Sequence, residues 1–194
     1  MKRCLAALLL FVTPLVSLDK EPIHRYEVLF SPNDHLAEEL VSMIDKERKS
    51  IKVAVYQFLH RGILKALIQA QERGVDVEVI VDSHSIKAKS PFRKISPFPL
   101  DVFVWSPSLQ VKELASGKKM KKKASSMHDK FCIFGDNRVW VGSFDFTLPA
   151  SNLDQESVIV LESREIASKY LEEFSRLKQE ATLPLKAYLT PEAL

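Results

Sequence analysis

The sequence has little cysteine, glycine or proline, with 2 Cys, 5 Gly and 10 Pro among 194 residues. Two cysteines, Cys4 and Cys132, are too few for a disulfide-dense scaffold, and we expect Cys132 to be a small buried residue rather than a redox group. The low glycine and proline content excludes a collagen-like or low-complexity chain, and an apolar fraction of 46% excludes intrinsic disorder. We therefore expect one globular domain, because domains usually hold about 100–200 residues.

The sequence also lacks a strong net charge, which is +3 overall, but its charges are unevenly distributed. Residues 83–130 hold eleven Lys or Arg and only three acidic residues, a net charge of +8, which leaves −5 for the rest of the chain. A basic middle segment of this kind indicates contact with an anionic partner, such as nucleic acid or an anionic membrane surface.

The apolar segment at the N-terminus is short for a membrane span. Lys2 and Arg3 precede fifteen uncharged, mostly apolar residues that end at Leu18. A spanning helix needs about 20 apolar residues, whereas the core of a signal peptide needs about 7–15. We expect residues 1–18 to be a secretory signal peptide, with an uncleaved membrane anchor or a buried helix as alternatives, and residues 19–194 to form the domain. The protein would then be secreted or periplasmic, or membrane-anchored in the alternative case.

Apolar periodicity predicts an α/β fold with a mixed sheet of six or seven strands and helices on both faces. A strand at 51–58, a helix at 63–72 and a strand at 75–81 form a βαβ unit, so the two strands should be parallel neighbours. The turn at 31–34 is expected to cap the helix that follows it. The other predicted strands are 26–30, 101–105, 130–134, 138–143 and 157–161, and the other predicted helices are 35–46 and 164–180.

One constellation of polar residues lies at the start of a predicted strand. His128 and Lys130 are two residues apart, so their side chains should point to the same face of the strand. A tight turn at 135–137 predicts a hairpin that returns the chain, with Ser143 and Asp145, towards His128. The sequence therefore predicts a cluster of imidazole, ammonium, hydroxyl and carboxyl groups beside the basic segment.

The spacing of these residues resembles the phospholipase D superfamily. The family pattern is His-x-Lys, about a dozen residues, Gly-Ser-x-Asn, and a Glu about eleven residues later. This chain reads HDKFCIFGDNRVWVGSFD from His128 to Asp145, followed by Glu156. The similarity extends to ILKALIQAQERGVDVEVIVD upstream and VIVLESREIASKYLEEF downstream, and thus to nearly everything after residue 25. With one His-x-Lys copy, the chain is most similar to the small single-motif members, the bacterial Nuc-type endonucleases and the mitochondrial cardiolipin hydrolase group.

The resemblance implies a phospholipase D-like fold for residues 19–194 and a phosphodiesterase that needs no metal or other cofactor. In the family, one histidine attacks phosphorus and forms a phosphohistidine, while another protonates the leaving alcohol and then activates water. One motif supplies half of this site, so the resemblance implies a homodimer in which two copies of His128 face one phosphate. The substrate would be nucleic acid or phospholipid, with endonuclease activity slightly favoured.

The resemblance also assigns roles to individual residues. His128, Lys130 and Glu156 would be catalytic, with Glu156 accepting a hydrogen bond from His128 that fixes the tautomer of the imidazole. Ser143 and Asp145 would bind the substrate phosphate, as small polar residues do in the family.

A run of lysines in the basic segment is a further candidate for substrate binding. We interpret it as an electrostatic platform for a nucleic-acid backbone or anionic lipid headgroups, with a solvated loop as the alternative. His60 and Arg61, which follow a core strand, are candidates for the border of the site. The run consists of Lys118, Lys119, Lys121, Lys122 and Lys123.

Two positions depart from the family pattern. The family has Asp five residues after the motif Lys, where this chain has Gly135 followed by Asp136. It has Asn where this chain has Asp145, and an ionised carboxylate only accepts hydrogen bonds and repels a phosphate. Either Asp145 is kept protonated, or it turns away, or activity is reduced. Two other functions therefore stay open: a weakly active or non-catalytic binder of nucleic acid or anionic membrane, and an enzyme in which Asp145 and Asp129 or Asp136 recruit a divalent metal.

Overall fold

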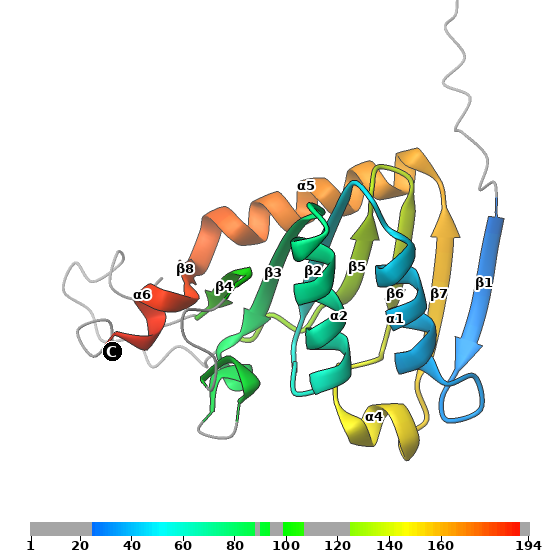
Figure 1. Ribbon diagram of the computed structural model, residues 1–194, viewed down its shortest axis with the longest axis horizontal. Coiled ribbons are helices and arrows are strands. Elements are labelled where there is room, and N and C mark those ends of the chain that lie inside the picture. The colour runs from blue at the N-terminus through cyan, green and yellow to red at the C-terminus, as the bar shows by residue number, and fades with distance from the viewer. Residues whose placement is uncertain (1–24, 88–89, 94–98, 107–124, 191–194) are drawn as a thin grey trace, which may run out of the picture.

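A computed structural model of the chain describes residues 25–87, 90–93, 99–106 and 125–190 (Figure 1). Within these ranges, eight strands form one mixed sheet in the order β1-β7-β6-β5-β2-β3-β4-β8. The sheet confirms the predicted α/β class and adds β8 to the predicted strands. The strands are β1 Arg25–Phe30, β2 Ser50–Val55, β3 Asp76–Asp82, β4 Asp101–Trp105, β5 Lys130–Phe134, β6 Arg138–Gly142, β7 Ser157–Glu162 and β8 Thr182–Pro184.

Helices cover both faces of the sheet, as predicted. In Figure 1, α1 and α2 lie in front of the sheet, and α5 packs against the opposite face. The long helices match the predicted ranges to within two residues, whereas the short ones were not predicted. The helices are α1 Leu36–Lys46, α2 Arg61–Glu72, α4 Leu148–Asn152, α5 Arg164–Ala181 and α6 Leu185–Leu189, and the 3-10 turns are η1 Ser83–Ile86 and η2 Pro91–Arg93.

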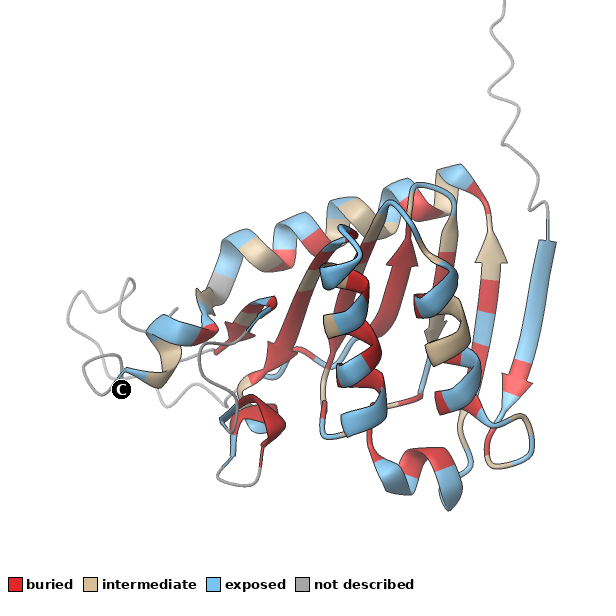
Figure 2. Cartoon of the chain, viewed as in Figure 1, coloured by how far each residue is buried: buried red, intermediate tan, exposed pale blue. Residues whose placement is uncertain are grey.

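The sheet has a hydrophobic core on each face, and the side chains of β2 point alternately into one and the other. Val53 and Val55 are buried in the core shared with α1 and α2, whereas Ala54 faces the core under α5. Strands β2 and β3 are parallel neighbours in the sheet, and α2 connects them in the sequence. This confirms the predicted βαβ unit. Figure 2 shows that the central strands are largely buried, whereas the edge strand β1 is mostly exposed.

The predicted hairpin is also present. Strands β5 and β6 pair in antiparallel fashion around a turn in which Gly135 has φ +58°. This left-handed backbone favours glycine, which accounts for one of the two departures from the family pattern. Cys132 on β5 is buried, as predicted, and burial raises the pKa of its thiol far above the ordinary value, so the thiol is not reactive.

Two local predictions were wrong. The turn before α1 does not cap the helix with a side chain: the N-cap is His35, with φ 48°, and Asp34 instead accepts a hydrogen bond from the backbone N–H of Phe30 (2.8 Å). Strand β2 ends at Val55 rather than Phe58, because the backbone N–H of Phe58 leaves the ladder and donates to the Ser85 hydroxyl (2.9 Å).

The predicted signal peptide or anchor, residues 1–18, lies outside the described residues. Within the described part of the chain, no helix is long and apolar enough to cross a membrane.

Position 142, the last residue of β6, accepts only glycine because the backbone of β7 passes very close to it. A Cβ atom at this position would lie 2.0 Å from the backbone oxygen of Ser157, which cannot move without breaking the β6–β7 pairing. We expect Gly142→Ala to lower the free energy of unfolding by at least about 3 kcal/mol, measured by urea denaturation. Gly62→Ala is the matched control, because its Cβ would meet only the His60 ring. Equal stability of the two variants would contradict this account.

Candidate active site

His128, Ser143, Asp145 and Glu156 lie next to strand ends at one edge of the sheet, the lower edge in Figure 1. The parallel strands β2 and β3 end at this edge, and the antiparallel strand β5 begins there with Lys130. The carbonyl oxygen of Asp129 accepts a hydrogen bond from the N–H of Tyr56 (3.0 Å), so the residues just before β5 stay attached to the end of β2. His128 is thereby held, exposed, at the end of the two core strands.

His128 and Lys130 are in direct contact, which confirms that they share a face. Lys130 Nζ lies 3.1 Å from Nδ1 of His128 and donates to the carbonyl oxygen of His128 (3.0 Å). The lysine is buried, with 8% of its surface exposed. An ammonium group has no lone pair, so it donates to Nδ1, and a neutral His128 then carries its ring proton on Nε2.

Asp145 points into the site, which excludes the alternative that its side chain turns away. Its Oδ1 accepts a hydrogen bond from the N–H of Gln57 (2.9 Å), and its Oδ2 lies 3.8 Å from Lys130 Nζ. Burial raises the pKa of the Asp145 carboxyl, with a further small rise from Glu156, while the Gln57 N–H, Lys130 and His128 act in the opposite direction. The carboxyl thus sits where a substrate phosphate would meet Lys130.

We expect Asp145→Asn to raise kcat/KM for a phosphodiester about tenfold at neutral pH, because an ionised carboxylate repels the substrate and an amide does not. Since the pKa of Asp145 is raised, wild-type Asp145 becomes neutral as the pH falls, and the advantage of the variant should shrink in acid. The measurement is kcat/KM against pH, with Asp136→Asn in the β5–β6 turn as control. Unchanged or lower activity of Asp145→Asn would show that the aspartate takes part in the reaction.

Ser143 and Glu156 pair with each other rather than with His128. The Ser143 hydroxyl donates to the Glu156 carboxylate and accepts from the N–H of Ser157 (3.1 Å). The β6–β7 register brings these residues together, since Ser143 N–H also donates to Ser157 O (3.0 Å). Among the hydrogen bonds of the described residues, the predicted bond from His128 to Glu156 is not present.

Three site residues were not predicted. The Tyr56 ring lies 4.5 Å from the His128 ring and 5.5 Å from the His84 ring, between centroids. Lys130 Nζ also lies 5.3 Å from the Tyr56 ring centroid. His84 in turn contacts the buried Asp82, with Nδ1 2.5 Å from Oδ1. Their positions in the sequence could have indicated them. Tyr56 directly follows β2 and Asp82 ends β3, and parallel strands end at the same edge of a sheet.

His60 is a structural cap beside the site. Its Nδ1 accepts from the N–H of Ile63 (3.2 Å) at the start of α2, and its own N–H donates to the Phe146 carbonyl (2.8 Å). Burial lowers the pKa of His60, and Glu38 opposes this shift. His60 thus borders the segment that holds Asp145, while Arg61 is exposed at the first position of α2.

Of the acidic residues considered for a metal, Asp136 lies away from the candidate site. Asp136 lies in the turn after β5, at the other end of that strand from Lys130, and forms an ion pair with Lys49 (3.7 Å). Burial raises the pKa of Asp129, with Glu173 of α5 adding to the shift. Among the residues that the structure describes, no group of three or more His, Cys, Asp or Glu is placed to hold a metal ion.

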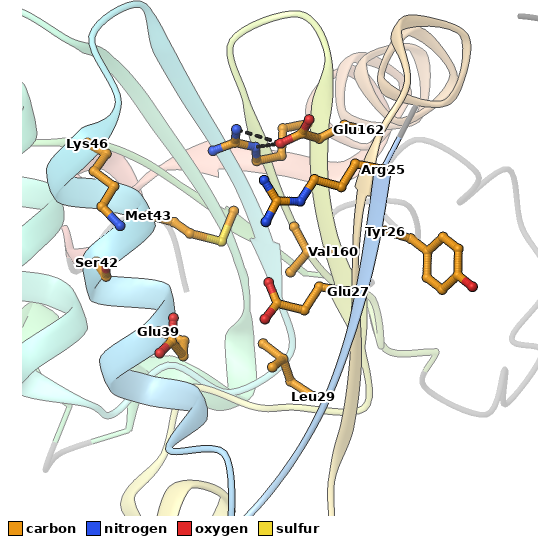
Figure 3. Close-up of a pocket in the computed structure, with 11 residues that line it drawn as sticks. Arg25, Tyr26, Glu27, Leu29, Glu39, Ser42, Met43, Lys46, Val160 and Glu162 are labelled. Atoms are coloured by element: carbon orange, nitrogen blue, oxygen red, sulfur yellow. Dashed lines mark hydrogen bonds and ion pairs between the residues drawn. The ribbon is translucent and has the colours of Figure 1, made fainter. Parts of the chain in front are cut away.

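The predicted lysine platform, 118–123, lies outside the described residues. A cavity of about 280 Å³ lies elsewhere, between β1 and α1, around the Arg138–Glu162 ion pair (2.7 Å) (Figure 3). Its lining mixes both signs of charge, for example Arg25 and Glu27, and includes none of the predicted site residues. Because the cavity holds none of these residues, the candidate site is the solvent-exposed edge of the sheet around His128.

Comparison with known sequences places the chain among phospholipase D-like proteins. Residues 40–178 match the family described as "Cardiolipin synthase, PLD-like domain". Phospholipase D of Rickettsia conorii is 29% identical over 150 residues, which cover 77% of this chain and 67% of that protein. The mitochondrial cardiolipin hydrolase of Xenopus tropicalis is 26% identical over 143 residues, which cover 73% of this chain and 60% of that protein.

Solved structures show the same fold. NucT from Helicobacter pylori superimposes with a TM-score of 0.69 at 23% identity and covers 82% of this chain and 98% of its own. Nuc from Salmonella typhimurium, described as a phospholipase D family member, gives a TM-score of 0.66 at 23% identity, with 82% and 97% covered.

Proposed function

This chain belongs to the phospholipase D-like family, and we propose on that premise that it hydrolyses phosphodiesters through a phosphohistidine at His128. The observation that carries the proposal is the contact between the exposed His128 and the buried Lys130, 3.1 Å apart, at an edge of the sheet lined by polar groups. An imidazole is a nucleophile, and an adjacent ammonium stabilises the charge that develops on the phosphoryl oxygens.

The proposed reaction begins when a phosphate displaces Lys130 from Nδ1 of His128. Lys130 Nζ then donates to a non-bridging oxygen, Nδ1 takes the ring proton, and the lone pair of Nε2 attacks phosphorus. The bond from phosphorus to the leaving alcohol breaks, and the alcohol takes a proton. Water then cleaves the phosphohistidine and releases a phosphomonoester. These steps need no metal ion.

We propose that the leaving alcohol takes its proton from His128 of a second chain. A single chain holds one His-x-Lys motif, and a twofold axis through the site would place two copies of His128 at one phosphate. The exposure of His128 at the sheet edge supports this arrangement. The substrate would be nucleic acid or phospholipid, because both present the same diester to these residues.

The test is cleavage by purified protein in the presence of EDTA. The substrates are single-stranded DNA, RNA and vesicles that contain cardiolipin, and His128→Ala is the control. We expect at least one substrate to be cleaved by the wild type and spared by the variant. Binding of these substrates without cleavage would favour the non-catalytic binder instead, and loss of cleavage with EDTA would contradict the metal-independent mechanism.

We also propose that the protein is exported, or attached to a membrane by residues 1–18. The basic start and the apolar run of this segment support the proposal. N-terminal sequencing of the protein from its own cells would show cleavage near residue 18 if the segment is a signal peptide, and an intact, membrane-bound N-terminus if it is an anchor.

A further inference from the structure

A buried carboxylate connects the end of β3 to the backbone just before His128. Asp82 is the last residue of β3, and 0% of its surface is exposed. Its Oδ1 accepts a hydrogen bond from the backbone N–H of His84 (2.8 Å) and contacts Nδ1 of the same residue (2.5 Å). Its Oδ2 accepts from the backbone N–H of Met127 (2.9 Å), which lies 45 residues further along the chain. The two oxygens of one side chain thus bind two segments that are remote in the sequence.

Local structure accounts for only one of these two oxygens. Asp82 is the N-cap of η1, and its bond to the N–H of His84 is one that a Ser, Thr or Asn cap also makes. A serine or threonine cap, with one short oxygen, would leave the buried N–H of Met127 without this partner. A fully buried carboxylate is costly unless it is hydrogen-bonded, so the second bond, to Met127, is the one that explains an aspartate here.

The bond to Met127 is one of two backbone anchors that enclose His128. On the other side, the carbonyl oxygen of Asp129 accepts from the N–H of Tyr56, directly after β2 (3.0 Å). The backbone on both sides of His128 is therefore tied to the ends of two parallel core strands, while the imidazole is exposed. A nucleophile must be held in line with the atom that it attacks, and a displacement of about 1 Å can cost about 10²-fold in rate.

We propose that Asp82 is a positioning residue that holds His128 in place for attack on phosphorus. The role rests on the proposed function and deepens it, because it identifies what fixes the backbone that carries the nucleophile. Asp82 acts through the N–H of Met127 and touches neither the substrate nor the reacting atoms. The steps of the proposed reaction are unchanged. Without Asp82, the imidazole and Lys130 would still be present, but the segment before β5 would be less constrained.

The test variant is Asp82→Ser, because serine is a good N-cap and keeps an oxygen for η1 but does not reach Met127. We expect its kcat with bis(p-nitrophenyl) phosphate, per folded molecule, to fall about 100-fold, while KM stays within about threefold of the wild type. Hydrogen exchange gives a readout besides activity. The Met127 amide should exchange as slowly as the core amides of β5 in the wild type, and much faster in the variant.

The matched control is Glu78→Gln, which removes a partly buried carboxylate from the same strand. Glu78 pairs with Lys52 and Lys178 and lies about 13 Å before Asp82 along β3. This variant should lower the melting temperature yet keep kcat within about twofold of the wild type. His35→Asn is a surface control at an exposed histidine that makes no side-chain cap hydrogen bond in its helix, and asparagine tolerates its left-handed backbone.

A folded Asp82→Ser variant that keeps the wild-type kcat, or an equal loss of kcat in Glu78→Gln, would overturn this role. If Asp82→Ser does not fold, the wild type alone decides: a Met127 amide that exchanges as fast as exposed loop amides would show that Asp82 does not hold the segment. Failure of the proposed function looks different. A wild type that cleaves diesters with no adduct on His128 refutes the phosphohistidine, while hydrogen exchange still reports the bond between Asp82 and Met127.

Discussion

His128→Ala should lower kcat/KM for phosphodiester cleavage by at least about 10⁴-fold, because the variant lacks the atom that bonds to phosphorus. His128 is exposed, and among the residues that the structure describes its side chain contacts Lys130 and Tyr56, so the fold should tolerate the change. The measurement is initial rate with bis(p-nitrophenyl) phosphate and with the natural substrate class found in the cleavage test.

His35→Asn again serves as control, because it alters an exposed histidine away from the His128–Lys130 contact. We expect its rate to stay within about twofold of the wild type, since surface changes of this kind seldom cost more than ±0.5 kcal/mol. A His128→Ala variant that is folded and keeps more than a hundredth of the wild-type rate would contradict the assignment of His128 as nucleophile.

Lys130→Met should lower kcat/KM by about 10²–10³-fold, the usual effect of removing one group that stabilises the developing negative charge. The Lys130 ammonium lies 3.1 Å from His128 Nδ1 and 3.8 Å from Asp145 Oδ2, so a phosphate bound at His128 would lie within its reach. Methionine keeps most of the side-chain volume, so the loss reports the charge rather than a cavity.

The Lys130→Met variant also leaves the half-buried Asp145 carboxylate without its nearby cation, which should destabilise the protein. The double variant Lys130→Met/Asp145→Asn separates the two effects. We expect it to recover most of the lost stability, measured by urea denaturation, but not the lost activity. Recovery of activity in the double variant would show that Lys130 serves only to offset the Asp145 carboxylate.

The sequence predicted the sheet and the central contact because both follow from local spacing. The apolar runs of β2, β3 and β5 predict buried central strands. The spacing of two residues at the start of β5 predicts the contact between Lys130 and His128, which lies just before the strand. The family pattern then pointed to the same residues, and the match over residues 40–178 confirms the family.

The hydrogen-bond partners of the site residues could not be predicted, because they depend on strand pairing between segments that are far apart in the sequence. The β6–β7 register places Ser143 beside Glu156, so the predicted His128–Glu156 hydrogen bond did not form. Asp82 and His84 lie more than forty residues before His128, and only the pairing of β3 with β2 and of β2 with β5 brings them to the site. The short elements β8, α4 and α6 have too few residues to show a periodicity.

The most direct test of the account is to find the covalent intermediate. Wild-type protein is mixed with excess bis(p-nitrophenyl) phosphate in EDTA, quenched in alkali during the first turnover, digested, and mapped by mass spectrometry. The account predicts a phosphoryl adduct on His128 in no more than half of the chains, because two chains share one phosphate. Rapid cleavage with the adduct on another residue, with none at all, or with every chain modified at once would contradict it.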